Sequence, residues 1–176
     1  MKPFEQFPDS LKKGIEHILT DIDGTLTVDG RIPSGVFSAM ERLQHAGIRV
    51  CAVTGRSAGW CDYIARMWPV EGVVGENGAF YFRYDPRGKK MIRRYVKPED
   101  ARRRDRERLH KLAAAILEAV PGCRVASDQA YRETDLAIDF SEDVPALPME
   151  GAERIVRCFK EAGAQAKISS IHVNGW

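Results

Sequence analysis

Asp21 and Asp23 are the residues of this chain whose types and spacing best suit chemistry. They lie at the end of a short apolar run, residues 18–22, of the kind that forms a buried parallel strand, and Gly24 follows them. Side chains two apart on a strand face the same way, so both carboxylates are expected to project together. With a divalent cation beside the pair, one carboxylate can attack phosphorus while the other handles a proton. Taken alone, the same letters fit an ordinary Asp-rich turn about equally well.

Two further segments have the same strand-then-loop pattern. The apolar run 48–53 leads into Thr-Gly-Arg-Ser at 54–57, and the run 73–74 leads into Gly-Glu-Asn-Gly-Ala at 75–79. A hydroxyl and a glycine between a strand and a helix form a phosphate cradle, because free N–H groups and the helix dipole both favour an anion. Parallel strands end at the same edge of a sheet, so the three loops are expected to meet in one crevice.

In this order, DxDGTL at 21–26, TGR at 54–56 and ENGA at 76–79 resemble the motifs of the haloacid dehalogenase superfamily of phosphatases. Most similar is the subclass whose cap domain is inserted between the second and third motifs, which includes sugar-phosphate phosphatases and phosphomannomutases. The resemblance is close over about the first 80 residues and rests on overall pattern afterwards. It implies a Mg²⁺-dependent phosphatase acting on a small phosphorylated metabolite, expected to be a sugar phosphate, with a phosphomutase as the alternative.

The resemblance also implies roles for individual residues. Asp21 would be the nucleophile that forms an aspartyl-phosphate, and Asp23 the general acid and then the general base. Thr54 would hold the phosphoryl group, together with backbone N–H groups near Gly24 and Gly55. Mg²⁺ would bind the Asp21 carboxylate and the Asp23 carbonyl and keep several waters.

Other residues near these motifs have supporting roles by the same resemblance. Arg56 and Asn77 would contact substrate, although a surface arginine at the start of a helix explains Arg56 equally well. Thr25 is expected to brace the loop through its hydroxyl.

The later part of the family pattern is missing from this chain. The family needs a lysine in a third motif and an acidic pair in a fourth, but no aspartate follows Asp143 and no lysine follows Lys167. We therefore expect a fragment of a longer phosphatase, or a truncated reading frame, with weak or absent turnover, because catalysis at such sites is mostly electrostatic positioning. The strand at 18–22 would then be left as an apolar edge that favours association, so a homo-oligomer is one expectation.

The chain as a whole predicts an α/β fold. It comprises the N-terminal half of a Rossmann-like parallel core at 1–84 and an α+β cap domain at 85–176. Helices are expected at 33–47, 57–68, 98–120 and 149–162, and further strands at 79–84, 91–96, 124–126 and 134–140.

Three expectations concern finer detail. Trp60, Ile64 and Met67 are interpreted as core residues of the helix 57–68. The alternation in 134–140 predicts an antiparallel strand with one wet face. Residues 168–173 resemble the cap's last strand.

Polar residues of the cap have two open interpretations. Asp128, Arg132, Glu133 and Asp135 either line its substrate face or are exposed strand and turn polarity. His172 is interpreted as a surface or packed histidine and not as a catalyst.

Residues 83–108 are strongly basic, with twelve Lys or Arg against five Asp or Glu. A nucleic-acid-binding fragment is therefore the alternative from another functional class. Against it, Glu99–Arg103, Asp100–Arg104 and Glu107–Lys111 have the acid-first i,i+4 spacing that stabilises a solvated helix face.

The composition is that of a globular protein. Charged residues make up 30% of 176 residues and the net charge is +2. No apolar segment approaches the roughly 20 residues that span a bilayer, the start lacks a signal peptide, and four cysteines lie without CxxC spacing. These features predict a cytoplasmic enzyme with no membrane partner.

Overall fold

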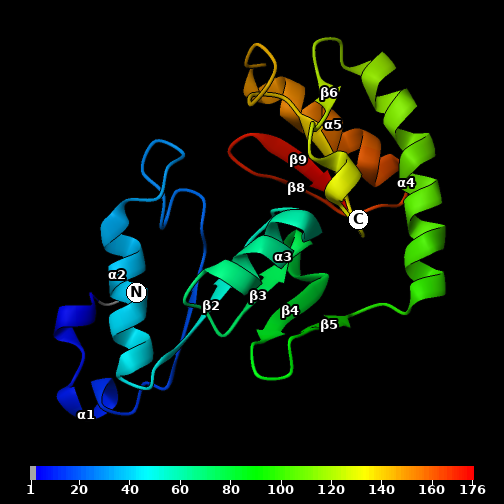
Figure 1. Cartoon of the computed structure of the whole chain (residues 1–176). Coiled ribbons are helices and arrows are strands. Elements are labelled where there is room, and N and C mark those ends of the chain that lie inside the picture. Colours follow the sequence, from blue (N-terminus) through cyan, green and yellow to red (C-terminus); the bar gives the residue numbers. More distant parts are fainter. Residues whose placement is uncertain (1–2) are drawn as a thin grey trace.

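The computed structural model describes residues 3–176, which form two sheets connected by a long helix (Figure 1). The first sheet has the strand order β1-β2-β3-β4-β5. Its strands are β1 (His17–Thr20), β2 (Arg49–Val53), β3 (Gly72–Gly75), β4 (Phe80–Asp85) and β5 (Lys90–Tyr95). The first three are parallel, and β4 and β5 add an antiparallel hairpin. This arrangement confirms the predicted α/β class with Rossmann-like parallel strands.

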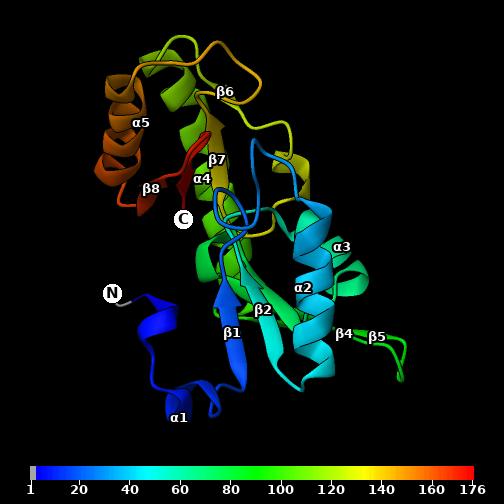
Figure 2. The same cartoon turned by 90° about the vertical axis from the view of Figure 1, so that its left-hand side faces the viewer.

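Helices α2 (Ser34–His45) and α3 (Ala58–Met67) connect the parallel strands and lie on one face of the first sheet (Figure 2). A short helix, α1 (Asp9–Lys12), precedes β1. Ile64 of α3 is 2% exposed, as expected of a core residue. Trp60 and Met67 are 49% and 66% exposed, so their assignment to the core was wrong. They lie on the side of α3 that faces solvent.

Strand β1 lies at the edge of the first sheet, paired only with β2 among the strands in residues 3–176. Leu19 of β1 is 70% exposed. The expected apolar edge is therefore present. An unpaired edge with an exposed leucine is a template for association.

The second sheet is antiparallel, with the order β6-β7-β9-β8. It consists of β6 (Arg124–Val125), β7 (Leu136–Asp139), β8 (Ala166–Ile168) and β9 (His172–Gly175). Helices α4 (Glu99–Ala119) and α5 (Met149–Glu161) pack against it. We call residues 3–95 the first unit and residues 99–176 the second unit. The first sheet runs to Tyr95, past residue 84, where the sequence-based boundary was set.

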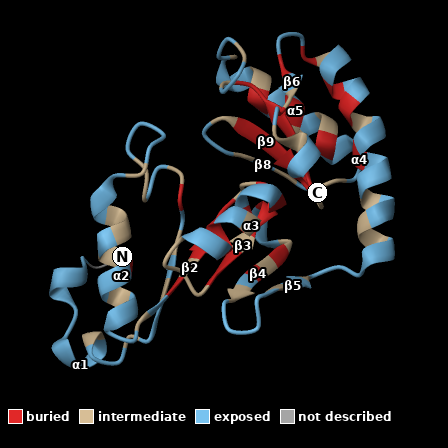
Figure 3. Ribbon diagram, viewed as in Figure 1, coloured by how far each residue is buried: buried red, intermediate tan, exposed pale blue. Residues whose placement is uncertain are grey.

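Each unit has its own hydrophobic core. The first contains Ile22, Ala52, Val73 and Phe80, and the second contains Ile116, Ile138, Ile155 and Phe159. Buried residues concentrate in β3 and β4 of the first unit and in β9 and the inner side of α5 in the second (Figure 3). None of the helices in the described part of the chain is both long and apolar enough to cross a membrane.

Two strand predictions for the second unit need correction. Residues 168–173 are not one strand, because Ser169 to Ile171 form the turn between β8 and β9. The predicted strand 134–140, which contains β7, has no wet face: Asp135, just before β7, and Asp139, at its end, are 2% and 1% exposed. Asp139 accepts three backbone N–H groups of the following loop, and Asp135 lies against the first unit.

Candidate active site

The loop after β1 is built around a buried anchor. Ile22 is 4% exposed in the first core, and its carbonyl accepts the backbone N–H groups of residues 25–27. The Thr27 hydroxyl braces this loop, accepting the Gly24 N–H at 2.9 Å and donating to the Ile22 carbonyl at 3.4 Å. The expectation that Thr25 braces the loop was wrong. Asp21 and Asp23 flank the buried isoleucine in sequence, so its side chain fixes the backbone between the two acids.

A cavity of about 730 Å³ lies between the two units. The first unit contributes the predicted site residues, and the second contributes an arginine and the β8–β9 hairpin. The lining includes Asp21, Asp23, Thr54, Gly55, Arg56, Asn77, Arg132, Lys167, Ser169, Ser170, His172, Asn174 and Trp176. Gly24 does not line this cavity, and its N–H is engaged by Thr27. All the other residues predicted from the sequence for catalysis or binding meet there.

The Thr54–Gly55 turn follows β2 at the floor of this cavity. Thr54 is 4% exposed, and its hydroxyl oxygen accepts the Arg56 N–H at 3.1 Å. A side chain at Gly55 would meet Asn77 Oδ1 at 3.3 Å, so Asn77 would have to shift by a few tenths of an ångström to make room for it. The Thr54 hydroxyl proton remains available to an acceptor in the cavity, because the oxygen acts as acceptor toward Arg56.

Arg56 makes a bidentate ion pair with Asp23 across the two loops. Its Nε and Nη2 donate to the two carboxylate oxygens at 3.0 and 2.8 Å. This hydrogen bonding raises the pKa of Arg56. A longer contact of 3.7 Å joins Arg56 to Glu142 of the second unit. Arg56 is therefore part of the cavity wall and not a surface residue at a helix start.

Residues 18–110 match the sequence profile of haloacid dehalogenase-like hydrolases. The chain belongs to this family. A phosphoglycolate phosphatase from Metallosphaera sedula is 40% identical over 75 residues, which are 39% of this chain and 32% of that protein. The chain thus spans about a third of the length of this curated relative.

Solved structures show the same fold. Protein 0175 of Thermoplasma acidophilum matches 92% of this chain and 64% of its own length, with a TM-score of 0.69 and 16% identity. A subclass IIB sugar phosphatase of the haloacid dehalogenase superfamily matches 91% of this chain and 69% of its own length, with a TM-score of 0.54 and 16% identity.

The acidic residues of the site suit a cation that is held by few protein ligands. Within residues 3–176, no three His, Cys, Asp or Glu side chains are grouped to hold a metal ion. Mg²⁺ needs only one or two carboxylates when it keeps several waters. The Asp21 carboxylate accepts one hydrogen bond, from the Ile22 N–H at 2.8 Å, and the Asp23 carbonyl accepts none from the described residues. These two groups can therefore hold a hydrated Mg²⁺.

His172 and Asn174 of β9 are cavity residues that the sequence did not predict as functional. They are 5% and 4% exposed and lie two apart on the strand, so they face the same way. His172 Nε2 lies 3.0 Å from a Glu142 carboxylate oxygen, and burial lowers the pKa of His172. Asn174 Oδ1 is buried without a hydrogen-bond partner in the described structure. The spacing of two residues between His172 and Asn174 on a strand is the sequence signal that could have identified them as a pair of polar residues facing one site.

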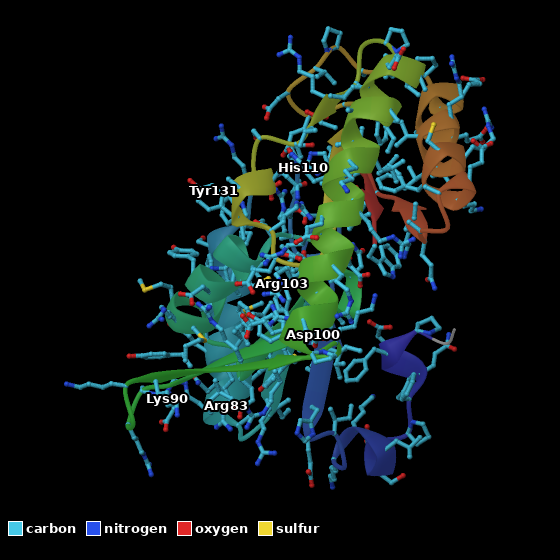
Figure 4. The ribbon with its side chains drawn as sticks, turned by 90° about the vertical axis from the view of Figure 1, so that its right-hand side faces the viewer. Arg83, Lys90, Asp100, Arg103, His110 and Tyr131 are labelled. Atoms are coloured by element: carbon cyan, nitrogen blue, oxygen red, sulfur yellow. The ribbon has the colours of Figure 1, made fainter. Side chains whose placement is uncertain are left out.

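The basic stretch at residues 83–108 is partly neutralised by ion pairs within the fold. Among its twelve cations, five form ion pairs with carboxylates of the described residues: Arg83, Arg93, Lys97, Arg102 and Arg104. The predicted pair Asp100–Arg104 is present at 2.8 Å. Figure 4 shows Arg83 and Lys90 on the β4–β5 hairpin and Asp100 and Arg103 on α4. The cations are thus distributed over two separate elements.

Proposed function

We propose that the protein hydrolyses a small phosphorylated metabolite through a covalent phosphoryl intermediate on Asp21. The cavity is the observation that carries this proposal. In it, two carboxylates and the Thr54–Gly55 turn lie on one side, and the β8–β9 hairpin closes the other. This combination of nucleophile, proton carrier and phosphate donor in one enclosed space suits phosphoryl transfer.

The chemistry follows from the residues on the first unit. The Asp21 carboxylate attacks phosphorus, a bond from Asp21 to phosphorus forms, and the bond to the leaving oxygen breaks. Thr54 donates its hydroxyl proton in a hydrogen bond to a phosphoryl oxygen. Asp23 gives a proton to the leaving oxygen and later takes one from the water that hydrolyses the intermediate.

Arg56 has a specific place in this proposal. It engages both oxygens of Asp23, so Asp23 must leave this ion pair and take up a proton from solvent before it can protonate the leaving oxygen. A phosphoryl group that enters the cavity is an alternative anionic partner for the guanidinium. We infer that Arg56 turns toward the substrate and releases Asp23 when the cavity is filled.

Mg²⁺ fits the same proposal as a cofactor. The Asp21 carboxylate and the Asp23 carbonyl would hold it, and it would neutralise part of the charge on the phosphoryl group. The described residues offer no group of three His, Cys, Asp or Glu side chains to complete the metal shell. We therefore expect weak Mg²⁺ affinity and slow turnover from the 176-residue chain.

A sugar phosphate is the substrate class we propose. The polar wall opposite Asp21 supports it, since Ser169, Ser170 and Asn174 can exchange hydrogen bonds with hydroxyl groups. The likeness in fold to a sugar phosphatase is a second support. Phosphoglycolate is the other candidate, favoured by the Metallosphaera relative and by Lys167, a cation in the cavity wall suited to a carboxylate.

The cytoplasm is the compartment that we propose for this protein. Its four cysteines are free thiols, which suits a reducing compartment.

Release of inorganic phosphate tests the proposal. The purified chain is incubated with a panel of sugar phosphates and phosphoglycolate, with Mg²⁺ and with a chelator. We expect phosphate release only with Mg²⁺, and its loss in Asp21→Asn. Asp29→Asn is the matched control, because it makes the same chemical change in an exposed residue outside the cavity. Equal phosphate release above the protein-free background in wild type and Asp21→Asn would exclude Asp21 as the nucleophile.

A gel shift with duplex and single-stranded DNA at low salt tests the alternative from another class. We expect no shift, because ion pairs within the fold already engage part of the basic stretch. A salt-sensitive shift would instead support a nucleic-acid partner.

A further inference from the structure

Glu76 is a buried carboxylate that the proposed reaction does not use. It is 1% exposed, and its φ of 43° is a costly conformation for a residue other than glycine. Oε1 accepts the N–H groups of Ala58 and Glu133, both at 2.9 Å. Oε2 accepts the N–H of Thr134 at 2.6 Å and also the Thr134 hydroxyl. One carboxylate of the first unit thus joins the start of α3 to the segment before β7 in the second unit.

A second set of hydrogen bonds leads from this segment to the phosphate-binding turn. Asp135 follows Thr134, and both of its carboxyl oxygens accept hydrogen bonds from Nη1 of Arg132, at 3.0 and 3.1 Å. The same Nη1 donates to the Gly55 carbonyl at 3.1 Å. The Arg132 and Asp135 side chains are 1% and 0% exposed, so water does not compete for these hydrogen bonds.

The Gly55 carbonyl and the Arg56 N–H belong to one planar peptide unit. Arg132 holds the carbonyl end of this unit, and its N–H end donates to Thr54 Oγ1 at 3.1 Å. Rotation of the peptide would break both contacts together. The peptide therefore sets the direction in which the Thr54 hydroxyl can donate its proton.

We propose that Glu76 is a positioning residue for the phosphate-binding turn. Through residues 133–135 and Arg132, it fixes the peptide that orients the Thr54 hydroxyl. This role rests on the proposed function, since the orientation has a use only when a phosphoryl group binds at Thr54. The second unit then helps to build the phosphate site, in addition to closing the cavity above it.

Glu76→Gln in the full chain at pH 8 tests this role. The amide nitrogen of glutamine can only donate, so it faces backbone N–H donors and at least one bond to Ala58, Glu133 or Thr134 is lost. Amide hydrogen exchange is followed by NMR, and inorganic phosphate binding by titration of the same spectra. We expect faster exchange at residues 133 and 134 and also at Arg56. The dissociation constant of inorganic phosphate should rise about tenfold.

Two controls separate positioning from loss of stability. Ile155→Val loosens the core of the second unit at a position that makes no contact with Glu76. Glu133→Gln changes a side chain that contacts Tyr95 and Arg102, while the backbone N–H of residue 133 still donates to Glu76. Both should retain the wild-type phosphate affinity and Arg56 exchange rate. If Glu76→Gln does not fold, Thr134→Val removes only the hydroxyl contact and should give a smaller effect of the same sign.

Specific outcomes would overturn the positioning role. One is faster exchange at 133 and 134 with unchanged Arg56 exchange and phosphate affinity, which would make Glu76 only a tether between the units. Another is an equal loss of phosphate affinity in Ile155→Val. Wild-type protein that binds no phosphate would count against the proposed function, while the Arg56 exchange rate would still decide whether Glu76 fixes the turn.

Discussion

The ion pair between Arg56 and Asp23 provides the most direct energetic test of the site. The two side chains are 25% and 32% exposed, so the pair is intermediate between a surface salt bridge and a buried one. A bidentate, charge-assisted pair in this environment should contribute about 1–1.5 kcal/mol of coupling energy. For a chain of this size, 1 kcal/mol corresponds to a shift in melting temperature of about 2–4 °C.

A double-mutant cycle measures this coupling. Arg56→Met, Asp23→Asn and the double variant are unfolded in urea, and the interaction energy is the non-additive part of the three changes. Asp100 and Arg104 form the matched control, because they also pair at 2.8 Å but are 57% and 65% exposed. The control should give a smaller coupling energy than the Arg56 pair and lose it in high salt. A coupling below about 0.3 kcal/mol for the Arg56 pair would refute its assignment as a defined contact.

Three further outcomes follow from burial. Leu19→Thr should reduce self-association at the β1 edge, measured by sedimentation velocity, and an unchanged sedimentation coefficient distribution would count against that edge as the contact. Phe159→Ala should lower the free energy of unfolding by about 3–5 kcal/mol, whereas Met67→Ala, at an exposed position, should change it by about 0.5 kcal/mol or less in urea titrations. Burial raises the pKa of Asp135 to about 7, so the folded chain retains a proton that the unfolded chain releases from about pH 4 upward. The free energy of unfolding should therefore fall as pH rises from about 4 to 7, and Asp135→Asn should remove that slope.

Local patterns were sufficient for the parallel strands and the β4–β5 turn of the first unit and for the start of α4 in the second. Residues 18–22 and 48–53 are apolar and short, and each is followed by a loop with glycine, so β1 and β2 were predictable, although β1 ends at Thr20, two residues before the predicted end. The long helix α4 begins after Pro98, as its sequence predicted. The turn between β4 and β5 was recognisable from Asp85-Pro86-Arg87-Gly88. These features depend on neighbours in sequence, which a single chain displays directly.

Helix α3 shows where that reasoning fails. Its apolar residues Trp60, Ile64 and Met67 have helical spacing, which identifies a stripe but not what covers it. Only Ile64 turns out to be buried, because β3 and β4 contact the helix on that side. Which side of a helix meets the sheet depends on the crossover geometry, and residue spacing within α3 does not contain it.

The site residues divide in the same way. Asp21, Asp23, Thr54 and Gly55 follow parallel strands, so the common edge of the sheet brings them together by a general rule. The opposite wall comes from β9, more than a hundred residues later in the chain. Contact between these walls depends on how the second unit docks, which no local pattern encodes.

The buried acidic residues near β7 show the same limit at the surface where the two units meet. Residues 134–140, which contain β7, alternate polar and apolar side chains as a strand with one solvated face does, yet Asp135 and Asp139 are buried. Asp135 is satisfied by Arg132 and by Asn77 of the first unit, so its polar face is directed at the other half of the molecule. A strand face that meets a polar interface can have the same sequence pattern as one that meets solvent, because both surroundings supply hydrogen-bond partners to charged side chains. Asp135, a buried acid that the pattern assigns to solvent, therefore marks the surface where the two units meet, and Glu76 lies at that surface.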